Sequence, residues 1–301
     1  MKTYLTKEKK NEILDLFSNS NNLLSEEEFK EIKYKLHNAC QDGDLELIKI
    51  LLSETIQDDS KDLTFKIDKT NQTASLFKVK VDVKHVIIPR SIKHDSVDYL
   101  VTSITGTDFY VKSIKFLDDS AVKRIYRGAL SGMYIEELCF PASLKELKEG
   151  WCSFTNSLTK ITVSPLNGQF LFNENKCLFG KSDPNKDEFD VLLFASRDIE
   201  EVVIPSNIKI ISSFAFEHCR ILKKVVIPKN SNLETIGSNA FLNSSIEVIF
   251  IPPKIAKIYE STFADCRNLT KVEIRPNSNL QSICHKDVLY MMFVLTKKIN
   301  Q

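Results

Sequence analysis

Apolar residues recur along the chain in triplets, at the first, fourth and sixth positions of short segments rich in β-branched residues. This spacing predicts a short strand with one buried face. Four successive triplets repeat every 23 or 24 residues and end at Ile204, Ile227, Ile251 and Ile274. Four earlier triplets end at Ile88, Phe116, Phe140 and Val163. The pattern therefore predicts about eight coils, each with one strand.

A turn and a return segment follow each strand. Proline, which lacks an N–H and can end a strand ladder, stands directly after five of them, at Pro89, Pro141, Pro205, Pro228 and Pro252. A second apolar pair spaced by three then follows, as in Ile208 and Ile211. Each coil can bury its apolar edge only against its neighbours, so the pattern predicts an α+β repeat fold, a solenoid with a parallel β-sheet. An ordinary sandwich of hairpins is the alternative, but Asn-Gly or Asp-Gly turns at hairpin spacing are missing.

The repeated strings VVIPSNIKIISSFAFEHC and VIFIPPKIAKIYESTFADC resemble the BspA-like class of leucine-rich repeat, the surface-antigen BspA-like family. That class carries Ile-Pro after the strand and Ala-Phe before a Cys or Asn. The resemblance covers roughly Leu63 to Ile283, and it implies a leucine-rich-repeat solenoid with a binding or adhesion surface, often displayed on microbial cells. Leu130 and Cys152 stand in early coils where the class has Phe, which predicts less regular coils there.

Residues 5–57 are predicted to be helical. The segment LHNACQDGDLELIKILLSE, residues 36–54, is similar to one ankyrin unit, with Gly43 at its turn. We expect this ankyrin-like segment to dock on the solenoid and cap it, and a free-standing protein-binding ankyrin module is the alternative. Residues 63–81 then predict a hairpin that covers the exposed edge of the first coil.

The period is interrupted once, because Val163 and Ile204 lie 41 residues apart. The extra segment near 165–198 alternates apolar runs with turns, which predicts an antiparallel hairpin or small sheet. We expect it to pack on the core, and a binding loop is the alternative. The predicted domains are a helical cap at 1–60, the solenoid at 61–284 and a C-terminal cap or tail at 285–301.

The charges are balanced, with 41 Lys and Arg against 40 Asp and Glu. A basic stripe with interleaved aromatic residues is missing, so nucleic acid is not an expected partner. Cys219 and Cys266 take the same place two coils apart, roughly 10 Å from each other by the spacing of strands. That separation is too long for a disulfide, so reduced, buried thiols are expected. The seven cysteines and five histidines show no metal-binding spacing, and we expect neither a metal site nor a cofactor.

Two lines of reasoning about location disagree. The N-terminus lacks an apolar core of signal-peptide type, and no apolar run approaches the ~18 residues of a membrane helix, which predicts a cytoplasmic protein without a transmembrane segment. The family resemblance implies the cell surface instead. Both locations stay open from the sequence, as does the oligomeric state.

Side chains between the inward triplet positions point outward. On the last coils they form an apolar patch with flanking charges, typical of a partner-binding site, and the candidates are Val203, Val226, Val248, Phe250, Glu201, Lys224 and Lys271. The alternative is that outward β-branched residues and a charge ladder between Glu201 and Lys224 stabilise the sheet itself.

The predicted function is a non-catalytic interaction or adhesion protein. It would bind a protein partner, with host and extracellular-matrix proteins as candidates, through the outward face of its leucine-rich-repeat sheet. Catalytic residues are not expected. The alternative is an enzyme that uses Cys177 in the 165–198 insertion with a distant histidine, but a recognisable base or phosphate-binding loop is missing.

Overall fold

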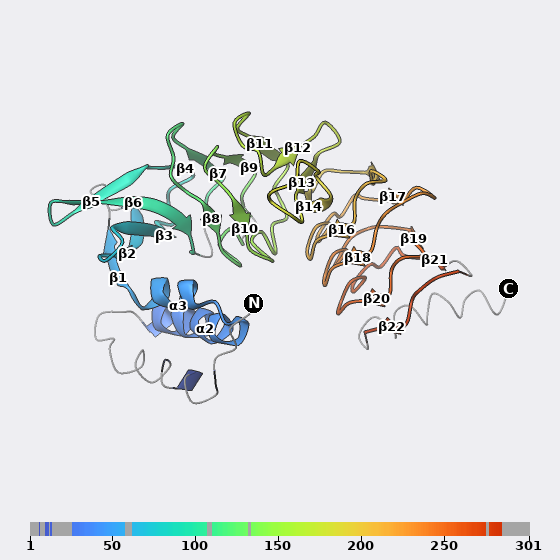
Figure 1. The fold of residues 1–301 in the computed structure, drawn as a ribbon, viewed down its shortest axis with the longest axis horizontal. Helices are drawn as coiled ribbons and strands as arrows, with labels where there is room; N and C mark the ends of the chain where they lie inside the picture. Colours follow the sequence, from blue (N-terminus) through green and yellow to red (C-terminus); the bar gives the residue numbers. More distant parts are fainter. Residues whose placement is uncertain are drawn as a thin grey trace.

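The computed structural model describes residues 6, 10, 11, 13, 26–57, 62–106, 110–131, 134–274 and 277–284. Within these residues the chain forms a curved stack of coils, with helices and a hairpin at its N-terminal end (Figure 1). The predicted C-terminal cap or tail, residues 285–301, lies outside the described residues.

All eight predicted triplets form strands, which line up as the first row of the solenoid. In the described part of the chain this row consists of two parallel four-stranded sheets. The first sheet contains β4 (His85–Ile88), β7 (Ser113–Phe116), β9 (Glu137–Phe140) and β11 (Lys160–Val163). The second sheet contains β15 (Glu201–Val203), β17 (Lys224–Val226), β19 (Val248–Ile251) and β21 (Lys271–Ile274). The predicted solenoid is thus confirmed, and its first row is divided between β11 and β15.

The return segments form a second row of mostly shorter strands. In the first half these are β6 (Val97–Ile104), β8 (Arg124–Ile125) and β10 (Glu146–Leu147), with β5 (Ser91–His94) antiparallel to β6. In the second half they are β14 (Val191–Ala195), β16 (Ile210–Ile211), β18 (Thr235–Ile236), β20 (Lys257–Ile258) and β22 (Ser282–Ile283). Neighbouring coils pair in parallel here too, as in β16 with β18. The apolar pairs spaced by three therefore end in strands.

Three phenylalanine rings stack in the core of the second half. Phe216 and Phe241 are parallel, with ring centroids 4.9 Å apart, and Phe241 and Phe263 follow at 5.6 Å. All three side chains are fully buried. Each ring belongs to a different coil, so the stack joins successive repeats directly.

The helices α2 (Glu26–Asp42) and α3 (Leu45–Leu52) turn at Gly43, as the ankyrin-like pattern predicts. Gly43 has a φ of 68°, a left-handed conformation that glycine adopts without a steric penalty. Asp44 then caps α3, because its side chain accepts a hydrogen bond from the N–H of Leu47 at 3.0 Å. The ankyrin-like part consists of these two short helices.

The prediction that residues 5–57 are helical is wrong for Glu54–Gln57, which form strand β1. Ser53 ends α3 with an extended backbone, and the next four residues pair antiparallel with β2 (Leu63–Asp68). β2 and β3 (Thr73–Val79) form the predicted hairpin. Because β3 pairs in parallel with β6, the hairpin covers the edge of the first coil, as expected.

The insertion packs into the solenoid, as predicted, and divides its core. β12 (Leu171–Phe172), β13 (Cys177–Gly180) and β14 are antiparallel neighbours, and β14 continues into the second row by pairing with β16. Side chains of β13 and β14 alternate between two buried clusters: Leu178 and Phe194 belong to the first, and Phe179 and Leu192 to the second. The hairpin β13–β14 therefore lies between the two core clusters and contributes side chains to both.

Arg197, which follows β14, is a buried cation at the boundary between the halves. Its Nε donates to the carbonyl oxygen of Thr155 at 2.8 Å. Its Nη1 donates to the carbonyl oxygens of Ala195 and Ala215, at 3.2 and 3.1 Å. The guanidinium also lies over the ring of Phe194, 4.3 Å from the ring centroid. One side chain thus links the main chain of a coil in each half.

Gly237 marks a close approach between two coils and gives a first prediction. A Cβ at this position would lie 2.5 Å from the backbone nitrogen of Ser213 and 2.9 Å from its Cα. Gly237→Ala must push these coils apart, so we expect it to lower the free energy of unfolding by about 1–3 kcal/mol, measured by urea denaturation.

Gly168→Ala is the matched control, because a Cβ there meets no atom within 4 Å. It should leave the free energy of unfolding within about 0.5 kcal/mol of the wild type. Equal stability of the two variants would contradict the stacking of coils at Gly237.

Candidate functional site

The second sheet places all seven predicted partner-binding residues on its outward face, because strand side chains alternate. The inward residues are buried: Val202, Val225, Ile249 and Val272. The outward residues come from all four strands: Glu201 and Val203 from β15, Lys224 and Val226 from β17, Val248 and Phe250 from β19, and Lys271 from β21. We call this set the outward patch.

In-register pairing arranges the outward patch in two columns of side chains that run across the strands. One column consists of Glu201, Lys224, Val248 and Lys271. In the other, Val203 lies opposite Val226, and Phe250 lies opposite Glu273. Val203 is 59% exposed and Val248 is 42% exposed, whereas Val226 and Phe250 are half-buried. The apolar side chains therefore form a strip across β15, β17 and β19.

Ion pairs flank the strip. The Nζ of Lys224 lies 3.8 Å from the carboxylate of Glu201, so the charge ladder considered from the sequence is present. Lys271 contacts the carboxylate of Glu273 on its own strand. Since each lysine of the patch has a carboxylate beside it, the charges of the patch are locally compensated, and its distinctive feature is the apolar strip.

The first sheet differs along the equivalent outward column. Ile87 on β4 is 61% exposed and pairs across with Lys115 on β7. Cys139 and Thr162 continue the column on β9 and β11. Ile87 is thus an apolar outward residue that is about as exposed as Val203. Its cross-strand neighbour is a lysine instead of a valine, so Ile87 serves as a comparison residue outside an apolar strip.

The thiol of Cys177, the alternative catalytic candidate, is buried in the second core cluster. Burial raises its pKa to about 12, so it is protonated at neutral pH. A nucleophilic cysteine needs the opposite, a lowered pKa and access to substrate. These surroundings disfavour a catalytic role for Cys177.

The cysteines and histidines give little chemistry among the described residues. All seven cysteines are free thiols, and Cys219 and Cys266 are buried, as predicted. Groups of three or more His, Cys, Asp or Glu side chains placed to hold a metal ion do not occur in the described ranges. Within the same ranges, no helix has both the length and the apolar character to span a membrane.

A groove that the sequence reasoning missed lies between α3 and the face of β2, β3 and β6. Its volume is about 990 Å³, and its lining includes Lys49, Lys66, Ser75, Ser103 and Lys123. These residues come from separate segments of the chain that meet only when the helices dock. The spacing of hydrophobic residues does not show which distant segments come together in the fold. In the sequence, the lysines of the groove look like ordinary surface residues.

Comparison with known proteins adds the repeat type. The model of the BspA type leucine rich repeat region matches six copies, over residues 70–177 and 188–295. No protein of curated function matches the sequence.

Several solved structures are similar to the chain. A leucine rich cell surface protein from Faecalibacterium prausnitzii A2-165 has 17% identity and a TM-score of 0.32, over 76% of this chain and 94% of that one. A leucine-rich repeat protein from Eubacterium ventriosum ATCC 27560 has 16% identity and a TM-score of 0.46, over 77% and 85%. The pneumococcal vaccine antigen PcpA has 13% identity and a TM-score of 0.28, over 81% and 96%.

Proposed function

Since the chain belongs to the BspA-type leucine-rich repeat family, we propose that it is a non-catalytic protein that binds a partner protein through the outward patch of its second sheet. A repeat family of this kind is consistent with a role in protein interaction. The observation that carries the proposal is the apolar strip of Val203, Val226, Val248 and Phe250 across three neighbouring strands. Contiguous exposed apolar side chains with a polar rim are typical of partner sites.

The strip also indicates the chemistry of the partner. Its centre is apolar, and the flanking lysines are already paired with Glu201 and Glu273. A complementary partner would therefore present an apolar segment, and surface ion pairs would add little to its affinity. Host and extracellular-matrix proteins are the partners we propose to test first, in an adhesion role.

The outward patch gives a second prediction. Phe250→Asp places a charge in the strip, so it should weaken partner binding about tenfold or more. Because the half-buried Phe250 also packs against the second core cluster, the test requires that the variant stays folded. The measurement is quantitative capture on immobilised matrix proteins and host-cell extract, with circular dichroism to confirm the fold.

Ile87→Asp is the matched control, because it adds the same charge at an equivalent outward position of the first sheet. A genuine partner is retained by the wild type and by Ile87→Asp and is lost from Phe250→Asp. Retention by Phe250→Asp as well would exclude the outward patch as the binding site.

The location of the protein decides where partners are sought. We propose protease treatment of intact source cells, followed by immunoblotting for residues 1–60 and for the solenoid. Loss of the solenoid signal while a cytosolic marker survives would support surface display and adhesion. Survival of both signals until lysis would support the cytoplasm and an intracellular protein partner.

We also propose the division into a cap at 1–60, a solenoid at 61–284 and a terminal segment at 285–301. The first boundary lies between β1 and β2, which pair with each other, and α3 also packs on β2, so the proposed cap is joined to the solenoid through a shared sheet. Limited proteolysis that cuts first near residue 60 would support this division.

A further inference from the structure

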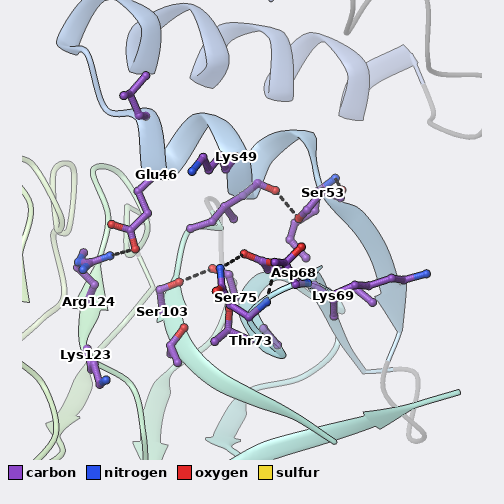
Figure 2. A pocket seen from close by; sticks show the side chains of 18 residues that line it. Glu46, Lys49, Ser53, Asp68, Lys69, Thr73, Ser75, Ser103, Lys123 and Arg124 are labelled. Atoms are coloured by element: carbon purple, nitrogen blue, oxygen red, sulfur yellow. Dashed lines mark hydrogen bonds and ion pairs between the residues drawn. The ribbon is translucent and has the colours of Figure 1, made fainter. Parts of the chain in front are cut away.

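The groove between the helices and the sheet is open to solvent on one side and carries several charged and hydroxyl side chains among apolar ones (Figure 2). Helix α3 forms its roof, and the face of β2, β3 and β6 forms its floor. Three polar contacts hold the helical cap on the sheet. Glu46 of α3 pairs with Arg124 of β8, Lys66 of β2 donates to the carbonyl oxygen of Ser53 at 3.1 Å, and Lys35 of α2 donates to that of Thr105 at 3.1 Å. The groove is therefore a fixed feature of the docked cap.

The lining of the groove is cationic. Five Lys and Arg residues line it against two acidic residues, Glu46 and Asp68. Glu46 is paired with Arg124, and Asp68 accepts hydrogen bonds from its own turn, from the N–H groups of Thr70 and Asn71 at 2.9 and 3.1 Å. Figure 2 shows Lys49 on the helix side of the groove and Lys123 on the sheet side. Arg124 also pairs with Glu146 at 2.9 Å, so the excess positive charge of the lining comes from its lysines, and it favours an anionic ligand.

A chain of bonded hydroxyl groups runs along the floor, on the buried residues Ser75, Ser103 and Thr105. Thr105 donates to the carbonyl oxygen of Leu76 at 3.3 Å, so at its 3.1 Å contact with Ser75 it must accept. Ser103 in turn donates to Ser75 at 2.9 Å. Ser103 has therefore used its proton, and although it is only 4% exposed it lines the groove, where its oxygen offers acceptor lone pairs to a ligand. The floor favours a ligand that donates hydrogen bonds.

We propose that this groove binds an acidic saccharide, a sugar chain that carries carboxylate or sulfate groups. Such a ligand combines both requirements, since its anionic groups suit Lys49 and Lys123 and its hydroxyls can donate to Ser103. The lining supplies six serine and threonine residues, which suits a polyhydroxylated ligand. The site is separate from the outward patch and does not depend on the proposed protein binding.

An acidic peptide fits the groove less well. Peptides that pair with a sheet need an unpaired strand edge. The floor strands are already paired, β2 with β3, β3 with β6 and β6 with β8, so the groove lies over a sheet face. Recognition here must come from side chains.

The test is calorimetric titration of the full chain with a heparin hexasaccharide, which carries sulfates and carboxylates, and with a hyaluronan hexasaccharide, which carries carboxylates only. We expect at least one to bind, more weakly as salt is raised. Lys49→Ala and Lys123→Ala should each weaken binding about tenfold, because each loses a charged contact. Both lysines are exposed, so both variants should fold. The better-bound saccharide distinguishes sulfate from carboxylate recognition.

Controls separate this groove from general charge attraction. Lys229→Ala removes an exposed lysine far along the chain and should bind like the wild type, as should Phe250→Asp. Failure of both saccharides to bind, or an equal loss in Lys229→Ala, would overturn the proposal. Binding of polyglutamate as tightly as the saccharides, with the same loss in the groove variants, would overturn it in favour of an acidic peptide.

Discussion

Phe241→Ala should lower the free energy of unfolding by about 3–5 kcal/mol, the range for removing a buried phenylalanine from a core. Phe241 is fully buried between Phe216 and Phe263, with ring centroids 4.9 and 5.6 Å away. The truncation leaves a cavity and also ends the stack that joins three coils. A folded domain is typically stable by only about 5–15 kcal/mol, so this is a large part of the total. Urea denaturation followed by circular dichroism measures it.

Leu166→Ala is the control for this prediction. Leu166 is 85% exposed, so its truncation should change the free energy of unfolding by less than about 0.5 kcal/mol. A loss below about 1 kcal/mol in Phe241→Ala would show that the stack does not hold the second half together.

Arg197→Met should destabilise the protein by on the order of 3 kcal/mol, although methionine fills much of the same volume. The carbonyl oxygens of Thr155, Ala195 and Ala215 would each lose a buried donor. Because Thr155 and Ala215 lie in different halves, we expect the two halves to unfold separately in this variant. Hydrogen exchange would show this as faster exchange in one half while the other stays protected.

Arg220→Met is the control for Arg197, because it removes the same group from an exposed position one coil later. Its stability should stay within about 0.5 kcal/mol of the wild type. If Arg197→Met kept full stability and a single unfolding transition, the link between the halves would have to come from the hairpin β13–β14 and from other contacts, such as the hydrogen bond from the N–H of Phe154 to Glu217 at 2.8 Å.

The sequence predicted the first row of strands well because each strand repeats the same buried positions. Residues such as Val202, Val225 and Ile249 meet the same surroundings in successive coils, so their spacing reports directly on the fold. The second row was harder to anticipate, since strands of two residues carry almost no pattern. Their positions follow from pairing with the neighbouring coil, as for Ile211 with Ile236.

The turns between the rows use a rule that the apolar pattern does not show. Successive coils carry two residues with positive φ, four positions apart, as in Asn239 and Asn243 or Ser261 and Asp265. Asn, Asp and His tolerate this left-handed conformation, but Phe214 and Ser261 also adopt it. Their conformations are therefore fixed by stacking between coils rather than by their own preference.

The outward patch could be predicted because strand alternation fixes which residues face outward. The partial burial of Val226 and Phe250 could not, since it depends on neighbouring side chains. The groove lay beyond prediction for a different reason. Lys49 and Lys123 are 74 positions apart and meet only because α3 docks on the sheet.

A photoreactive amino acid placed at position 203, and separately at position 87, would test the binding face. Both native residues are outward and similarly exposed, 59% for Val203 and 61% for Ile87, but only Val203 belongs to the apolar strip. After irradiation in the source cells, we expect a partner protein to be cross-linked to position 203 and not to position 87. Adducts at position 87 alone, or equal adducts at both positions, would contradict partner binding through the second sheet.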